Sequence, residues 1–198
     1  MSVSRAVVLV LALLALAGCS SAASTPVSPS GAYAASVVPD TGQPPFPKLG
    51  QYWVVDPENA CHLSHDSVVL VDQVLEKLRT DHIAEVAIVC QTGVKDQGPL
   101  NDEKIWTLKW GNWARIGDAK DQRGVVVLIR PDVKPEENRI TIENSVWIYQ
   151  NTVLTYQPVI EEAARYANAG DYDGCIESLA RNLDETLRKV VQPNQSQP

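Results

Sequence analysis

The sequence predicts an α/β protein, a three-layer α/β/α sandwich built on a small mixed sheet. Two observations predict this class. Continuous apolar runs within residues 85–91 and, at 125–129, within residues 123–130 are typical of buried strands. Stretches whose apolar residues recur at helical spacing precede and follow these runs, so that helices and strands alternate along much of the chain.

The domain is expected to begin with extended chain and then a helix. Residues 51–56 (QYWVVD) form either a short edge strand or a packed segment that leads into the fold. Ser64 is a suitable N-cap for a helix at 65–80, where the apolar residues recur with helical period. The buried strand at 85–91 follows it.

A second helix is expected at about 102–116, with Asn101 as its cap. Trp106, Trp110 and Trp113 are spaced so that their rings share one face of this helix. Core packing under the sheet explains such a face better than a ligand site does.

The second half of the domain is predicted to hold two strands and two helices. Residues 123–130 form the central strand, and the alternation in 139–145 indicates a half-buried strand that closes a hairpin. A helix with Pro158 in its first turn runs to Asn168. Asp171 then caps a last helix at about 172–190.

The N-terminus has the features of an export signal. Arg5 precedes an apolar run, residues 6–17, which is shorter than the roughly 20 residues that span a bilayer. The run ends in Leu-Ala-Gly-Cys, which resembles the bacterial lipobox and implies cleavage before Cys19 and lipidation of Cys19. An ordinary signal peptide that is cut near residue 22 or 23 is the alternative.

These features divide the chain into four parts. Residues 1–18 are the lipoprotein signal peptide, and residues 19–50 are the lipidated cysteine and a linker rich in Pro, Ser and Ala. Residues 51–191 form the folded domain, and residues 192–198 a polar tail. The expected location is a cell membrane or outer membrane, on its non-cytoplasmic side.

The charge of the chain bears on its partners. The formal net charge is -7, and no basic patch interrupts the acidic balance. Nucleic-acid binding is therefore not expected. The expected partners are the membrane, through the lipid anchor, and an envelope protein.

Four motifs resemble those of the TPM domain family. They are Val55-Asp56 before Leu63-Ser64, then Trp110-Gly111 with Ile116-Gly117, then Asp121 to Val125, and last Gly170-Asp171-Tyr172 with Gly174. The resemblance covers residues 51–190 and implies a TPM-like fold. Family members are mostly membrane-tethered, non-cytosolic modules. Some resemble calcium-binding proteins, some plant members are described as acid phosphatases, and others act as assembly or repair factors for membrane complexes.

An acidic site is predicted where the central strand begins. Asp118 and Asp121 lie in the loop before that strand, and Glu143 and Asn144 should return to the same edge of the sheet. Together they could hold a hard cation such as calcium, although calcium takes six to eight oxygen ligands. The alternative is that the two aspartates are solvated turn residues.

The cysteines predict a disulfide, because export makes oxidation favourable. The start of the first helix and the end of the following strand should lie at one edge of the sheet, which favours Cys61 with Cys90. Cys175, in the last helix, is then free or is the true partner of Cys61.

Residues near the start of the first helix allow two further interpretations. Cys61, His62, His65 and Asp66 could suggest a zinc site, which we consider the weaker explanation because a helix start needs polar residues in any case. Asp56 is expected at the end of the sheet opposite the acidic site, where it would act as a local cap or turn residue.

The sequence favours a binding or accessory module over an enzyme. The leading hypothesis is a lipid-anchored envelope protein that works through protein contacts near the membrane, on a surface such as the outer face of the last two helices. The alternatives are a metal-assisted phosphatase that uses Asp118 and Asp121, and a passive calcium-binding domain.

Overall fold

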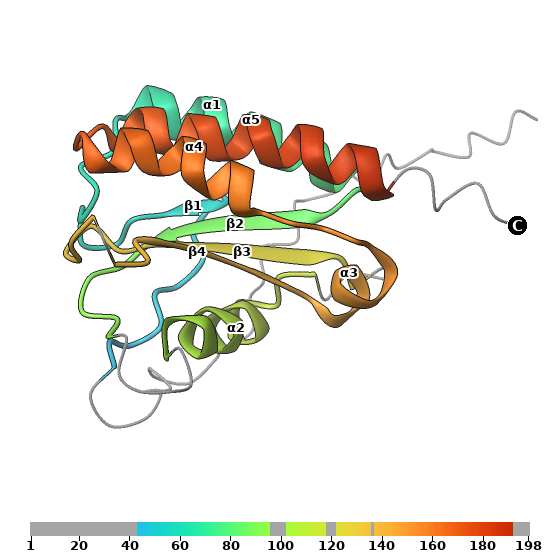
Figure 1. Ribbon diagram of the computed structural model, residues 1–198, viewed down its shortest axis with the longest axis horizontal. Coiled ribbons are helices and arrows are strands. Elements are labelled where there is room, and N and C mark those ends of the chain that lie inside the picture. The colour runs from blue at the N-terminus through green and yellow to red at the C-terminus, as the bar shows by residue number, and fades with distance from the viewer. Residues whose placement is uncertain (1–42, 96–101, 118–121, 136, 192–198) are drawn as a thin grey trace, which may run out of the picture. The chain divides into compact units, whose positions relative to one another are not determined.

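The computed structural model describes residues 43–95, 102–117, 122–135 and 137–191, all within the compact unit Ala35–Pro198. The predicted fold class is confirmed. A four-stranded sheet lies between two layers of helices (Figure 1). In the part of the chain that the structure describes, no helix is both long enough and apolar enough to cross a bilayer.

The sheet is mixed, with its strands in sequence order. The strands are β1 (Val54–Val55), β2 (Glu85–Cys90), β3 (Gly124–Ile129) and β4 (Ile140–Asn144). β1, β2 and β3 run parallel, whereas β4 pairs antiparallel with β3 and closes the hairpin. The segment at 51–56 therefore supplies a short edge strand.

Helices cover both faces of this sheet. One face carries α1 (His65–Thr80), α4 (Gln157–Asn168) and α5 (Tyr172–Val191), and α2 (Asp102–Ala114) covers the other (Figure 1). The short α3 (Val146–Asn151) follows directly on β4.

The core forms two apolar layers because successive side chains of a strand point to opposite faces. In β3, Val125, Val127 and Ile129 belong to the layer shared with α1 and α5. Val126 and Leu128 belong to the layer shared with Trp106 and Trp110 of α2. The tryptophan face is thus core, as its spacing predicts.

Local cap signals in the sequence are also confirmed. The Ser64 hydroxyl accepts a hydrogen bond from the Ser67 N–H at 3.2 Å. The Asp171 carboxylate accepts one from the Gly174 N–H at 2.9 Å at the start of α5. The predicted cap of α2, Asn101, lies outside the described residues.

The packed part of the domain starts before residue 51, within the segment predicted as linker. Phe46 is buried, and its ring lies edge-on to Trp106 with a centroid distance of 5.5 Å. The Trp106 and Trp110 indole N–H groups donate to the carbonyls of Pro44 and Pro47. Residues 43–50 therefore pack along α2 instead of acting as a spacer.

Two glycines hold the chain close together where β3 begins. Gly117 has a φ of +80°, and a Cβ atom there would lie 2.3 Å from the Gly124 nitrogen. A Cβ on Gly124 would lie 2.4 Å from the Ile116 carbonyl oxygen. Only glycine fits this crossing, which fixes where the chain enters the sheet.

Candidate functional site

The predicted acidic site is only partly visible. Asp118 and Asp121 lie outside the described residues. Glu143 and Asn144 occupy the end of β4, where Asn144 pairs with Val125 and Glu143 with Val126. Because β3 begins at Gly124, these two side chains return to the edge at which the loop before β3 ends, as expected.

Glu143 borders a small cavity of about 30 Å³, the volume of roughly one water molecule. Its walls come from α2, the start of β3 and the end of β4. The lining residues are Leu108, Gly111, Asn112, Ile116, Gly124, Val126, Glu143, Asn144 and Ser145.

The electrostatics around Glu143 favour its neutral form. Burial raises the pKa of the Glu143 carboxyl, Lys104 lowers it, and the negative charge of Glu103 raises it again, for a net increase.

Asn144 is already engaged by a neighbouring side chain. Its amide oxygen accepts a hydrogen bond from the Tyr156 hydroxyl at 2.5 Å. Burial raises the pKa of Tyr156, so the phenol remains a donor. The described residues of this site therefore offer one carboxylate and one occupied amide oxygen, well short of the ligands that calcium takes.

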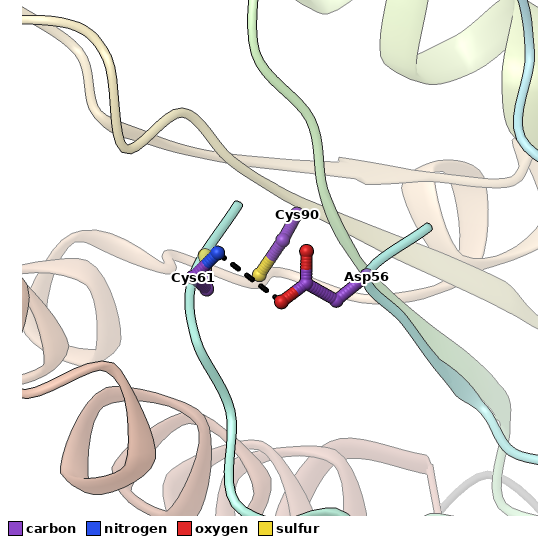
Figure 2. Close-up of side chains that lie close together, drawn as sticks. All are labelled: Asp56, Cys61 and Cys90. Carbon is purple, nitrogen blue, oxygen red and sulfur yellow. Dashed lines mark hydrogen bonds between the residues drawn. The ribbon is translucent and has the colours of Figure 1, made fainter. Parts of the chain in front are cut away.

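A second group of reactive side chains lies at the opposite end of the sheet. Asp56, Cys61 and Cys90 each place a ligand atom, a carboxylate oxygen or a sulfur, within 4.8 Å of the other two. Figure 2 shows the Cys90 sulfur and the Asp56 carboxylate directed toward one another. We call these three residues the thiol cluster.

The fold positions each member of the thiol cluster. Cys90 is the last residue of β2, and Asp56 follows β1, so parallel pairing brings both to the carboxyl edge of the sheet. The Asp56 carboxylate accepts hydrogen bonds from the Ala60 N–H at 2.6 Å and the Cys61 N–H at 3.1 Å. These hydrogen bonds stabilise the turn that carries Cys61, so Asp56 acts as the local turn residue that the sequence predicts.

The three cysteines of the described residues are free thiols, and all are buried. Burial raises the pKa of Cys90, and it raises that of Cys175 to about 12. The expected proximity of Cys61 and Cys90 is present. Their disulfide, like the alternative with Cys175, stays a prediction.

The weaker zinc interpretation, with histidine ligands, does not match the structure. His62 and His65 are exposed, and no group of possible metal ligands among the described residues includes them. The His62 Nδ1 atom lies 3.1 Å from the Asn59 amide nitrogen, and the His65 ring lies edge-on to Tyr52. Asp66 is exposed as well. The helix start directs these side chains outward, away from the buried Cys61.

An open cavity of about 310 Å³ lies beside the thiol cluster. Asp56 lines it, together with residues of β1 and the first turns of α1. The other lining residues are Val54, Asn59, Leu63, His65 and Val68. The carboxylate of Asp56 thus faces both the buried sulfurs and a space that is open to solvent.

An exposed apolar surface follows β4. Val146 and Tyr149, three residues apart on α3, are 65% and 79% exposed, and Val153 beyond the helix is fully exposed. Beside them, the Arg123 guanidinium lies 4.3 Å from the centre of the Trp147 ring. We call Val146, Tyr149 and Val153 the α3 surface.

The comparisons with known proteins show the fold. No protein-family model matches the sequence, and no curated protein matches it. The chain is similar to the solution NMR structure of the N-terminal domain of a protein from P. gingivalis, with a TM-score of 0.55 and 20% identity over 69% of this chain and 82% of that chain. A second similar structure is the N-terminal domain of the cg2496 protein from Corynebacterium glutamicum, with a TM-score of 0.44 and 14% identity over 76% of this chain and 86% of that chain.

The sequence interpretation missed two features of possible function. The α3 surface was not foreseen because residues 146–151 were left unassigned. Asp56 was placed correctly at the far end of the sheet but was not connected to the cysteines. Parallel pairing of residues 54–55 with the strand at 85–90 was the missing information, because the carboxyl ends of parallel strands meet at one edge.

Proposed function

We propose that this protein is a lipid-anchored accessory module of the cell envelope, with a TPM-like domain that acts through protein contacts near the membrane. The α3 surface carries the proposal. Scattered exposed apolar residues are ordinary, but an aromatic and two valines on one short segment are typical of a protein contact site. We place the contact there and not on the last two helices.

The outward faces of α4 and α5 suit solvent better than a partner. They carry ion pairs such as Glu162 with Arg165 at 3.3 Å and Glu185 with Lys189 at 2.6 Å. Exposed pairs of this kind contribute little binding free energy. Their apolar residues point into the core.

The proposed contact can be tested by capture from envelope membranes. The full chain and its Tyr149→Ser variant would be crosslinked in cells and recovered through a tag. We expect a partner that the unaltered chain recovers and that Tyr149→Ser reduces at least about tenfold, since a central aromatic commonly contributes 1.4 kcal/mol or more.

Two controls make this test specific. Leu70→Ser removes an apolar side chain that is 51% exposed on α1, and it should leave recovery unchanged. Residues 1–42 fused to an unrelated domain report on proteins that bind only the anchor. Equal recovery by that fusion, or by Tyr149→Ser, would contradict the proposal.

The membrane anchor has its own test. Cys19→Ser should move the protein from the membrane fraction to the soluble fraction and abolish incorporation of labelled fatty acid. A Ser20→Ala variant is the matched control. If Cys19→Ser stays lipid-labelled, the anchor is not at this residue.

The alternative functions depend on Asp118 and Asp121. A metal-assisted phosphatase would hydrolyse a generic phosphomonoester and lose turnover in Asp121→Ala. A calcium-binding domain would gain about 2.7 kcal/mol of unfolding free energy in calcium at a hundred times the dissociation constant. It would therefore melt at a higher temperature, and chelator would reverse the rise. The described residues of the acidic site offer only Glu143 and an amide oxygen already bonded to Tyr156, which makes these the second choice.

A further inference from the structure

We propose that the thiol cluster is a binding site for a soft, tetrahedrally coordinated metal ion of the Zn²⁺ class, with Asp56, Cys61 and Cys90 as its protein ligands. This site is distinct from the predicted acidic site and from the α3 surface. It does not depend on the proposed function.

The donor types fit this ion. Two sulfurs and one carboxylate oxygen are donors that zinc takes, and three protein ligands leave the fourth position of the ion for a water molecule or another ligand. Calcium would not be held by it, because calcium takes oxygen ligands in larger number. The ion would be Zn²⁺ or a metal with similar preference for sulfur.

The distances fit as well. Zinc bonds to sulfur at about 2.3 Å and to oxygen at about 2.0 to 2.2 Å, so two ligand atoms on one ion lie roughly 3.5 to 3.8 Å apart. The ligand atoms of Asp56, Cys61 and Cys90 already lie within 4.8 Å of one another. Shifts of about 1 Å, which side-chain rotation supplies, would close the site.

The carboxylate is held in place for this task. Its two hydrogen bonds from the N–H groups of Ala60 and Cys61 fix its orientation and leave lone pairs on both oxygens. The 310 Å³ cavity reaches the same side chain and provides a path for the ion.

Metal binding has to release protons from the cysteines and neutralise the charge of the resulting thiolates. Burial raises the pKa of the Cys90 thiol, and a cysteine that binds metal has to release its proton. The ion supplies the positive charge that two thiolates and one carboxylate require.

Oxidation would compete with metal binding. A Cys61–Cys90 disulfide removes two electrons and two protons from the pair, and it leaves no thiolate on either residue to bind metal. The disulfide and the metal-bound state are therefore mutually exclusive. The redox conditions of the protein's own compartment decide which of the two forms.

The test uses the full chain, reduced without oxygen, freed of metal and titrated with Co²⁺ and then Zn²⁺. We expect one Co²⁺ ion per chain with a sulfur-to-cobalt absorption band, which Zn²⁺ abolishes by displacement. Cys61→Ser and Cys90→Ser should lose the band and weaken Zn²⁺ binding at least about 100-fold. His62→Ala, the matched control, should change binding less than about threefold.

Two measurements on the unaltered chain guard against variants that fail to fold. X-ray absorption of the zinc-loaded protein should show a sulfur shell at about 2.3 Å. Protein isolated from its own cells should contain zinc and free thiols. A missing cobalt band, a zinc shell of only nitrogen and oxygen, or isolated protein that holds a Cys61–Cys90 disulfide and no zinc would each overturn the proposal.

Discussion

Asp56 shows how one side chain can organise a turn. It accepts two backbone N–H groups directly after β1 and so positions Cys61. We expect Asp56→Ala to lower the free energy of unfolding by about 2 kcal/mol, because both N–H groups lose a charged acceptor. Urea denaturation measures this.

A matched control for this change is Asp66→Ala, which removes an exposed carboxylate from the first turn of α1. It should cost no more than about 0.5 kcal/mol. Equal losses in the two variants would mean that Asp56 acts only as a surface charge.

Glu143 gives a pH-dependent prediction. Its folded pKa is raised by burial, so the folded state holds its proton to higher pH than the unfolded state does, and this group's contribution to stability falls as the pH rises through the raised value. Glu143→Gln should therefore be more stable than the unaltered chain at pH 7, by at most about 1 kcal/mol since the side chain is half exposed.

The gain from Glu143→Gln should disappear below the ordinary glutamate pKa, where the carboxyl is neutral in both states. Denaturation of both chains at several pH values measures it. A larger gain at low pH than at neutral pH would contradict the assigned cause.

Some residue-scale features were predictable and some were not. The caps Ser64 and Asp171 depend on neighbours three residues away, so local sequence reveals them. The proximity of Cys61 and Cys90 follows from one helix and one strand. The approach of Asp56 to the same sulfurs depends on the pairing of a two-residue strand, which periodicity cannot indicate.

At the scale of elements, the crossing of Gly117 and Gly124 is the most restrictive feature. Gly117→Ala should cost about 2 to 4 kcal/mol, because it combines a left-handed backbone with a Cβ 2.3 Å from the Gly124 nitrogen. Thermal or urea denaturation measures the loss.

Gly93 provides the comparison for that prediction. It also has a positive φ, +72°, but a Cβ there would meet no atom within 4 Å. Gly93→Ala should cost only the backbone strain, about 1 to 2 kcal/mol. If Gly93→Ala costs as much as Gly117→Ala, the close approach contributes nothing.

The element that sequence reasoning missed is α3. Its residues, VWIYQN, are mostly β-branched or aromatic, which favours strand. Its N-cap, Ser145, gives no local signal because the hydroxyl donates to the Gln122 carbonyl and caps no N–H group of the helix. The longer helices were found because several turns of periodic apolar residues outweigh such details.

For the whole molecule, the boundary of the folded domain matters most. Phe46→Ala should lower the free energy of unfolding by about 3 kcal/mol, because it empties a buried aromatic position against Trp106 and Trp113. A chain that starts at residue 51 should lose at least as much unfolding free energy as a chain that starts at residue 43 and carries Phe46→Ala.

Lys48→Ala is the control in the same segment, since Lys48 is exposed, and it should change stability by less than about 0.5 kcal/mol. If a chain that starts at residue 43 and a chain that starts at residue 51 unfold at the same temperature, residues 43–50 do not belong to the folded domain. The packing of this segment is hard to predict from sequence, because its prolines are typical of a linker and Phe46 is its one large aromatic residue.

The attachment of residues 43–50 to α2 also determines how the domain bears mechanical load. A pull applied through the residues before Gln43 reaches first the carbonyls that the two tryptophans hold, and then β1, whose two residues form one edge of the sheet. The segment at 43–50 and the edge strand β1 can each detach by breaking their hydrogen bonds one after another. β2 and β3 are held on both sides because they lie between other strands. Under tension the N-terminal side would yield early, and the remaining layers would stay folded.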